Sequence, residues 1–175
     1  MILRCTANLL EMLGCRPGDI VAADPSPNDW YGDLFWVDRR KCLHLMHAGT
    51  LFAIFVPDIR KAKLPPLGPF LIHHIENTLA DESLPANTFG RLDPTDVGLA
   101  KTASRSLLGC MRQDRQFLQR GVAMSGGLAS CDPRQLNHEL HRTVHLPGGR
   151  GVVWPLDEVH RQARLCAQQT RSHTQ

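Results

Sequence analysis

Trp30 to Val56 reads WYGDLFWVDRRKCLHLMHAGTLFAIFV, and this stretch decides the fold. It contains three runs rich in aromatic and β-branched residues, which favour strands, at residues 31–37, 42–47 and 50–56. Polar residues 38–41 and an Ala-Gly pair separate the runs, and Pro57 ends the third because proline cannot donate to a strand ladder. The stretch therefore predicts a three-stranded antiparallel β-meander over residues 31–56.

Shorter elements flank this meander on both sides. Strands are predicted near residues 2–5 and 97–102, and apolar residues at helical spacing predict an amphipathic helix over residues 66–83. Further helices are predicted to begin at Ser104, Asp132 and Pro155. Because strands and helices do not alternate strictly, we predict an α+β fold with a largely antiparallel sheet and with helices packed mainly on one face.

The length and composition fit one globular domain. The chain has 175 residues, 42% of them hydrophobic, which suffices for one core. We predict a single domain over residues 1–167 and a disordered polar tail over residues 168–175. No apolar run approaches the roughly 18 residues that cross a bilayer, and the first residues lack the pattern of a secretory leader. We therefore expect a cytoplasmic protein that contacts no membrane.

Six cysteines are scattered along the chain without a C-x-x-C pair. A core of this size needs no disulfides to hold it together, and a cytoplasmic compartment keeps thiols reduced. We predict six reduced cysteines, most of which pack as small hydrophobic side chains.

Basic residues are concentrated in the second half of the chain. Residues 1–88 hold 8 Lys or Arg and 10 Asp or Glu, whereas residues 89–175 hold 12 and 7, which together give the net charge of +3. Nearly all bases of the second half are Arg, which binds carboxylates and phosphates in a bidentate manner. This distribution favours an anionic small molecule or a protein as partner. Because the Arg residues are spread over several elements, we expect no nucleic-acid partner.

Three segments carry a resemblance to a known family. They are residues 30–42, which end in Asp-Arg-Arg-Lys-Cys, residues 50–62, and residues 100–109, which read AKTASRSLLG. In these segments, and over most of its length, the chain resembles a family of small bacterial proteins described only as a domain of unknown function. The resemblance implies a bacterial source and one domain of similar size, and it carries over no catalytic residue. Ser104 stands where the family usually has Asn or Asp, which keeps a capping side chain.

The strongest candidate site is the start of the helix that Ser104 caps. Free backbone amides and the positive end of the helix dipole attract anions at such a place, and neighbouring cations would add to the attraction. Bases in the first turn of the meander would join the site if that turn lies at the same end of the sheet. The candidate anion-binding residues are Lys101, Ser104, Arg105, Ser106, Arg39, Arg40 and Lys41. The alternative is that the serine only caps the helix and that the basic turn is only solvated.

The nine histidines do not form a recognisable metal motif. His138, His141 and His145 fall on one helical stripe, but the HELH sequence is one residue short of the H-E-x-x-H zinc motif. His73 and Glu76 lie three residues apart without further identified ligands. Sequence motifs for a catalytic Ser or Cys are also missing, and no Asp or Glu lies in a recognisable catalytic pattern. We predict no metal and no cofactor, and the catalytic residues of any enzyme stay unknown.

Trp30, Tyr31, Phe35 and Trp36 stand close to basic residues, a combination found in proteins that bind single-stranded nucleic acid. Core packing is the preferred explanation, because both faces of this predicted strand are apolar. Such a strand is either central in a sheet or part of an oligomer interface. The second of these explanations predicts a homodimer.

We expect a non-catalytic binding or interaction domain with a basic, anion-accepting site at a helix N-terminus. The alternative is a small enzyme that acts on a phosphorylated or nucleotide-like substrate through the same basic site. An enzyme would need a histidine or a carboxylate in the pocket that holds the bases, whereas a binding domain needs only an accessible groove or apolar patch. The lack of a catalytic motif favours the binding domain over the enzyme.

Overall fold

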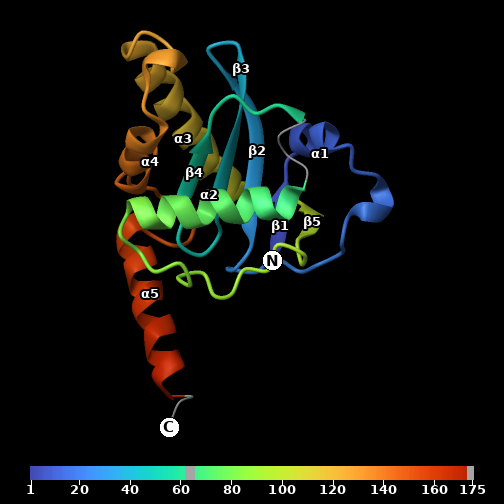
Figure 1. Cartoon of the computed structure of the whole chain (residues 1–175), viewed down its shortest axis with the longest axis vertical. Coiled ribbons are helices and arrows are strands. Elements are labelled where there is room, and N and C mark those ends of the chain that lie inside the picture. Colours follow the sequence, from blue (N-terminus) through green and yellow to red (C-terminus); the bar gives the residue numbers. More distant parts are fainter. Residues whose placement is uncertain (62–65, 173–175) are drawn as a thin grey trace.

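The computed structural model describes residues 1–61 and 66–172, which contain a five-stranded sheet between helices (Figure 1). The strands are β1 (Ile2–Cys5), β2 (Trp30–Val37), β3 (Arg40–His47), β4 (Ala53–Val56) and β5 (Gly98–Lys101). The helices are α1 (Ala7–Leu13), α2 (Leu67–Asp81), α3 (Arg105–Met124), α4 (Pro133–His141) and α5 (Pro155–Ser172). Single turns of 3-10 helix are formed by η1 (Pro17–Asp19) and η3 (Leu128–Ser130).

The sheet is mixed, with the strand order β4-β3-β2-β1-β5. β2, β3 and β4 form the predicted antiparallel meander, in which Trp36 pairs with Lys41. β1 runs parallel to both of its neighbours, with Leu3 opposite Trp30 on one side and opposite Leu99 on the other. The α+β class is therefore confirmed, but the prediction of a largely antiparallel sheet is wrong. Parallel strands are joined by long crossovers, so no local turn signal in the sequence reveals their pairing.

Helices cover both faces of the sheet, so the prediction that they lie mainly on one face is wrong (Figure 1). α1 and α2 pack on one face in a core that includes Leu9 and Ile75, and α3 and α4 pack on the other with Met111 and Leu140. The cause is β2, whose alternating side chains enter both cores. The first core receives Trp30 and Leu34, and the second receives Tyr31, Phe35 and Val37. One chain covers both faces of β2, so this strand does not require a dimer interface, and the homodimer stays a prediction.

The β2–β3 hairpin turns on only two residues. Asp38 (φ 46°) and Arg39 (φ 62°) both adopt the left-handed conformation that the favoured two-residue hairpin turn requires. Arg40 and Lys41, which the sequence assigns to the turn, therefore lie in β3. The Asp38 carboxylate accepts a hydrogen bond from the backbone amide of Leu128 at 3.0 Å, which holds the turn against η3.

α5 extends away from the sheet and continues to Ser172 (Figure 1). It thus includes residues 168–172 of the predicted tail, while residues 173–175 lie outside the described residues, and the division into a domain and a tail stays a prediction. No helix in the described part of the chain is long and apolar enough to cross a membrane. None of the six cysteines, all of which are described, forms a disulfide.

Candidate functional site

The start of α3 is a capped helix end with two exposed cations beside it. Ser104 Oγ accepts a hydrogen bond from the Leu107 amide at 3.3 Å. Ser106 Oγ accepts one from the Gly148 amide at 2.8 Å, which brings the turn around Gly148 against the helix start. Lys101 and Arg105 are both exposed. The cap therefore uses one of the first amides of α3, while the two cations stay open to solvent.

The basic residues of the hairpin lie at the opposite end of α3. There, the Gln119 side chain donates a hydrogen bond to the Trp36 carbonyl oxygen, and Asp38 binds the amide of Leu128 beyond the helix. α3 has 20 residues and is therefore about 30 Å long. The structure thus brings one part of the predicted anion site together and separates it from the other part. The first part is Lys101, Ser104, Arg105 and Ser106, and the second is Arg39, Arg40 and Lys41.

A cavity of about 640 Å³, here called the switch crevice, lies at the carboxyl ends of the parallel strands β1 and β5. α1 follows β1 onto one face of the sheet, and α3 follows β5 onto the other. In open sheets, ligands bind in the crevice outside the carboxyl ends of parallel strands whose connections leave to opposite faces. The lining is mostly small or apolar, with side chains such as Ala7, Leu10 and Val21, and Lys101 supplies a cation.

Arg4 also reaches the switch crevice, but its guanidinium is already bound. The residue is 2% exposed, and its Nε donates a hydrogen bond to the Asp29 carboxylate at 2.5 Å. A terminal nitrogen donates to the carbonyl oxygens of Ala23 and Asp24 at 2.9 and 2.8 Å. Arg4 therefore holds the loop before β2 against β1, and among the described lining residues Lys101 is the exposed cation.

The described residues that line the switch crevice include no histidine, aspartate or glutamate. Cys15 is the thiol of the lining, and burial, followed by the negative charge of Asp19, raises the pKa of Cys15 above its usual value. A protonated thiol is a poor nucleophile because the thiolate is the reactive form. Burial therefore keeps the thiol of the lining in its less reactive form.

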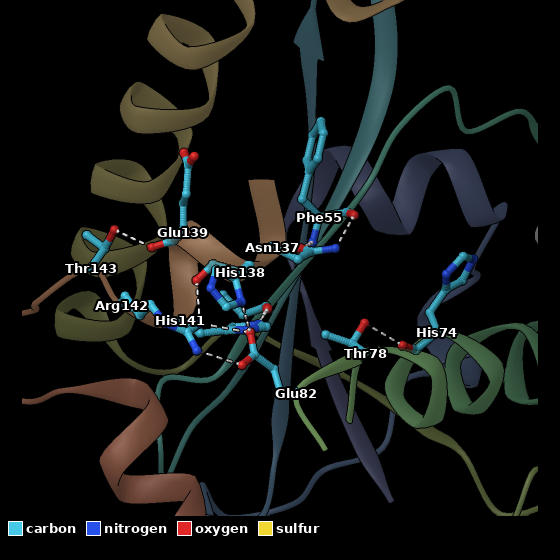
Figure 2. A network of polar contacts seen from close by, with 11 residues as sticks. Phe55, His74, Thr78, Glu82, Asn137, His138, Glu139, His141, Arg142 and Thr143 are labelled. Carbon is cyan, nitrogen blue, oxygen red and sulfur yellow. Dashed lines mark hydrogen bonds and ion pairs between the residues drawn. The ribbon is translucent and has the colours of Figure 1, made fainter. Parts of the chain in front are cut away.

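A second polar site, the Glu82 cluster, joins the end of α2 to α4 and consists of Glu82, His138, His141 and Arg142 (Figure 2). Arg142 donates a hydrogen bond of 3.0 Å to each carboxylate oxygen of Glu82. The Nδ1 atoms of His138 and His141 lie 3.1 and 2.8 Å from Glu82 Oε1. Burial alone would raise the pKa of Glu82, but the hydrogen bonds and charges of His141 and Arg142 lower it to about 2.

α4 also protects the outer edge of the sheet at β4 (Figure 2). The Asn137 side chain accepts a hydrogen bond from the Phe55 amide at 2.6 Å and donates one to the Phe55 carbonyl at 3.2 Å. His141 Nε2 lies 2.7 Å from the Ala53 carbonyl oxygen, and the ring stacks on Phe52. Unpaired groups on an edge strand invite pairing with another chain. His141 therefore has a structural role, because its two nitrogens lie beside the Glu82 carboxylate and the Ala53 carbonyl oxygen.

His145, the third member of the predicted histidine stripe, lies in a different place. It belongs to the Asp114 cluster, in which His44 Nε2 and His145 Nε2 lie 3.1 and 3.3 Å from the two Asp114 oxygens, and all three residues are at most 1% exposed. Burial opposes charge here, yet the two histidines lower the pKa of Asp114, and Asp114 raises the pKa of His145 to about 9. The described residues contain no group of three or more His, Cys, Asp or Glu placed to hold a metal ion.

Sequence analysis missed Arg4, Glu82 and Asp114, the charged residues at the centre of the contacts in the switch crevice, the Glu82 cluster and the Asp114 cluster. A single Arg in a strand and a Glu after a helix have no sequence signal. Asp114 does have one, because it lies on the apolar face of α3, four residues after Cys110 and four before Leu118. An acid on the buried face of a helix indicates a buried partner.

The family model for a domain of unknown function (DUF6933) matches residues 2–158 of the chain. The chain therefore belongs to this family, which confirms the resemblance to a domain of unknown function, while the bacterial source stays a prediction. The matched range includes the five strands, the first four helices and the start of α5, and thus the switch crevice and both clusters. No curated protein and no solved structure matches the chain.

Proposed function

We propose that this member of the DUF6933 family is a non-catalytic binding module. Its ligand is a small molecule with an anionic head and an apolar body, held in the switch crevice beside the start of α3. The observation that carries the proposal is the position of the crevice, where α1 and α3 leave neighbouring parallel strands toward opposite faces.

The cations beside the crevice support an anionic head group. Lys101 lines the crevice, and Arg105 follows four residues later in the first turn of α3. The positive end of the helix dipole lies at the same place, and the hydroxyl of Ser106, which accepts from Gly148, still has a hydrogen to donate. Ser104 contributes by capping the helix start, where its Oγ accepts a hydrogen bond from the Leu107 amide. Arg39, Arg40 and Lys41 are not part of this proposed site because they lie at the far end of α3.

The lining supports an apolar body on the same ligand. Ala7, Leu10, Ile20 and Val21 offer hydrocarbon surface, and the cavity volume lies within the range of small-molecule sites. An enzyme acting on a phosphorylated substrate would need a histidine or a carboxylate here, and the described lining residues include neither. The same geometry therefore favours binding over the enzymatic alternative.

Calorimetric titration with octyl phosphate, inorganic phosphate and octanol tests the proposal. We expect octyl phosphate to bind more tightly than the other two, because it alone combines the charge with an apolar chain. The double variant Lys101→Ala and Arg105→Ala is expected to bind octyl phosphate at least about tenfold more weakly, since hydrogen bonds to charged groups contribute about 1.5–3 kcal/mol.

The matched control is the double variant Arg112→Ala and Arg120→Ala, which removes two exposed charges from the same helix away from its start. It should keep the affinity of the natural chain. Equal binding of octyl phosphate by both double variants, or no saturable binding by the natural chain, would overturn the proposal.

A further inference from the structure

Trp36 is exposed on a strand whose other aromatic residues are buried. Its relative exposure is 58%, against 1% for Trp30, 2% for Tyr31 and 4% for Phe35. Trp36 is the second-last residue of β2, and the tip of the β2–β3 hairpin projects past α2 (Figure 1). Core packing therefore explains three of the four aromatic residues near the basic turn and leaves Trp36 unexplained.

A cavity of about 650 Å³, here called the Trp36 groove, lies beside this side chain. Trp36 and Leu34 line it from β2, and Asn8 and Glu11 line it from α1. The third side is the segment after β4, which the hydrogen bond from the Ile59 amide to the Lys41 carbonyl at 2.7 Å ties to the hairpin. The groove therefore combines an exposed indole with a volume that fits a small molecule.

Among the described residues, three cations line the Trp36 groove against one acid, Glu11. Lys41 pairs with Trp36 across the two strands, and its Nζ lies 5.4 Å from the centroid of the indole ring. Arg60 and Lys61 come from the segment after β4. The pair of Arg60 with Asp58 is 3.6 Å long and its arginine is 71% exposed, so it holds the guanidinium only weakly. The groove is thus positively charged around a flat aromatic surface.

We propose that the Trp36 groove binds a nucleotide unit, with its base stacked on Trp36 and its phosphate paired with Lys41, Arg60 and Lys61. Every base has a face that stacks on an aromatic side chain, and cations beside the stack hold the backbone or the free phosphate. A double helix does not expose base faces, so the unit is either a free nucleotide or part of a single strand. This inference reverses the expectation that nucleic acid is no partner, because the sequence does not reveal that Trp36 is exposed.

Fluorescence anisotropy with a labelled ten-nucleotide oligo(dT) at low salt tests this proposal, with AMP as competitor. We expect saturable binding that Trp36→Ala weakens at least about fivefold and that Trp36→Phe largely restores, since loss of one base–aromatic stack removes that much affinity or more. Trp154→Ala is the matched control, because Trp154 is the other exposed tryptophan at 49% and directly precedes α5 instead of lying on the hairpin. It should leave binding unchanged.

Salt dependence tests the role of the cations separately. Removal of Lys41 and Arg60 by Ala substitution is expected to lower the slope of log affinity against log salt by roughly 0.7 for each phosphate that the groove no longer neutralises. Arg164→Ala, on the exposed side of α5, is the control for charge alone. Displacement of the oligonucleotide by AMP at a similar molar affinity identifies a free nucleotide, whereas binding that grows with strand length identifies a single strand, and both support the proposal.

The proposal is overturned if Trp36→Ala and Trp36→Phe bind like the natural chain, or if duplex DNA binds as tightly as the single strand. The absence of saturable binding to both oligo(dT) and AMP has the same consequence. The double variant Lys101→Ala and Arg105→Ala should bind the oligonucleotide normally. This last measurement separates the Trp36 groove from the switch crevice, so either proposal can fail alone.

Discussion

Asp114 and Glu82 are two enclosed carboxylates that each contact two imidazoles, yet their surroundings differ. Asp114 lies inside the core between the sheet and α3, where it and both of its histidines are at most 1% exposed. The Glu82 side chain is 5% exposed at the rim between α2 and α4, and it contacts Arg142, which is 42% exposed, and His138, which is 55% exposed. The same residue types thus form one sealed cluster and one that reaches solvent.

The difference lies in the source of the positive charge. The guanidinium of Arg142 gives Glu82 a counter-charge that does not depend on an imidazole. Asp114 depends on imidazoles, which lose their charge when they lose a proton. The sealed cluster should therefore couple folding to pH, while the rim cluster should be insensitive to pH until the carboxylate itself is protonated.

The largest effect is expected from Asp114→Asn. The change leaves His145, whose pKa Asp114 raises, buried without its counter-charge, and breaking a buried ion pair by removal of one partner costs about 3–5 kcal/mol. Urea unfolding at pH 7 measures the free energy of unfolding. Asp24→Asn, at an exposed aspartate, is the control and should change it by less than about 0.5 kcal/mol. A loss below about 1 kcal/mol in Asp114→Asn would contradict the assignment of a charged cluster.

Alkaline pH should weaken the natural protein through the same cluster. The pKa of His145 is about 9 in the folded state against an ordinary value of 6.5, so its stabilisation is complete below pH 6.5 and is lost as pH rises through 9. The expected loss is on the order of 3 kcal/mol. Urea unfolding between pH 6 and pH 10 measures it, and Asp114→Asn should remove most of this pH dependence. A flat profile in the natural chain would disprove the coupling.

Glu82→Gln should have a smaller effect than Asp114→Asn and the opposite pH dependence. Gln keeps the shape but loses the charge, and because the partners are half exposed we expect a loss of about 1–2 kcal/mol at pH 7. The pKa of Glu82 is lowered from 4.5 to about 2, so this stabilisation is present above pH 4.5 and disappears as pH falls through 2. Unfolding curves of the two proteins should therefore converge in acid. A constant difference down to pH 2 would show that packing rather than charge explains the loss.

His138→Ala is the control for the rim cluster, because His138 is the most exposed of its members. Its free energy of unfolding should fall by less than about 0.5 kcal/mol, as for other exposed ion pairs. A larger loss than in Glu82→Gln would mean that the imidazole, and not Arg142, neutralises the carboxylate.

Local patterns in the sequence predicted the elements well. The meander is present, the helix expected over residues 66–83 is α2, and Ser104 caps α3 by its side chain. These features depend on neighbouring residues, namely on alternation, helical spacing and a capping hydroxyl. The parallel pairing of β1 with β5 depends on residues almost a hundred positions apart, and no local pattern encodes it.

The candidate sites were predictable only in part, for the same reason. Lys101 and Arg105 are near one another in the sequence and remain neighbours in space. Whether the bases at Arg39 to Lys41 join the same site depends on which end of the sheet the hairpin turn occupies, and the sequence does not give this. In the structure, α3 separates these bases from Lys101 by most of its length. The stripe of His138, His141 and His145 divides between two carboxylates, because α4 ends at His141 and His145 turns into the core.

The sequence by itself determined that β2 is apolar on both sides, that the chain forms an α+β domain, and that a basic helix start follows residue 101. Only the tertiary structure decided that helices cover both faces, that a crevice opens where β1 and β5 end, and that Trp36 remains uncovered. The physical reason is that side-chain alternation and capping act over a few residues, whereas crevices and exposed faces arise where segments distant in the chain meet or fail to meet.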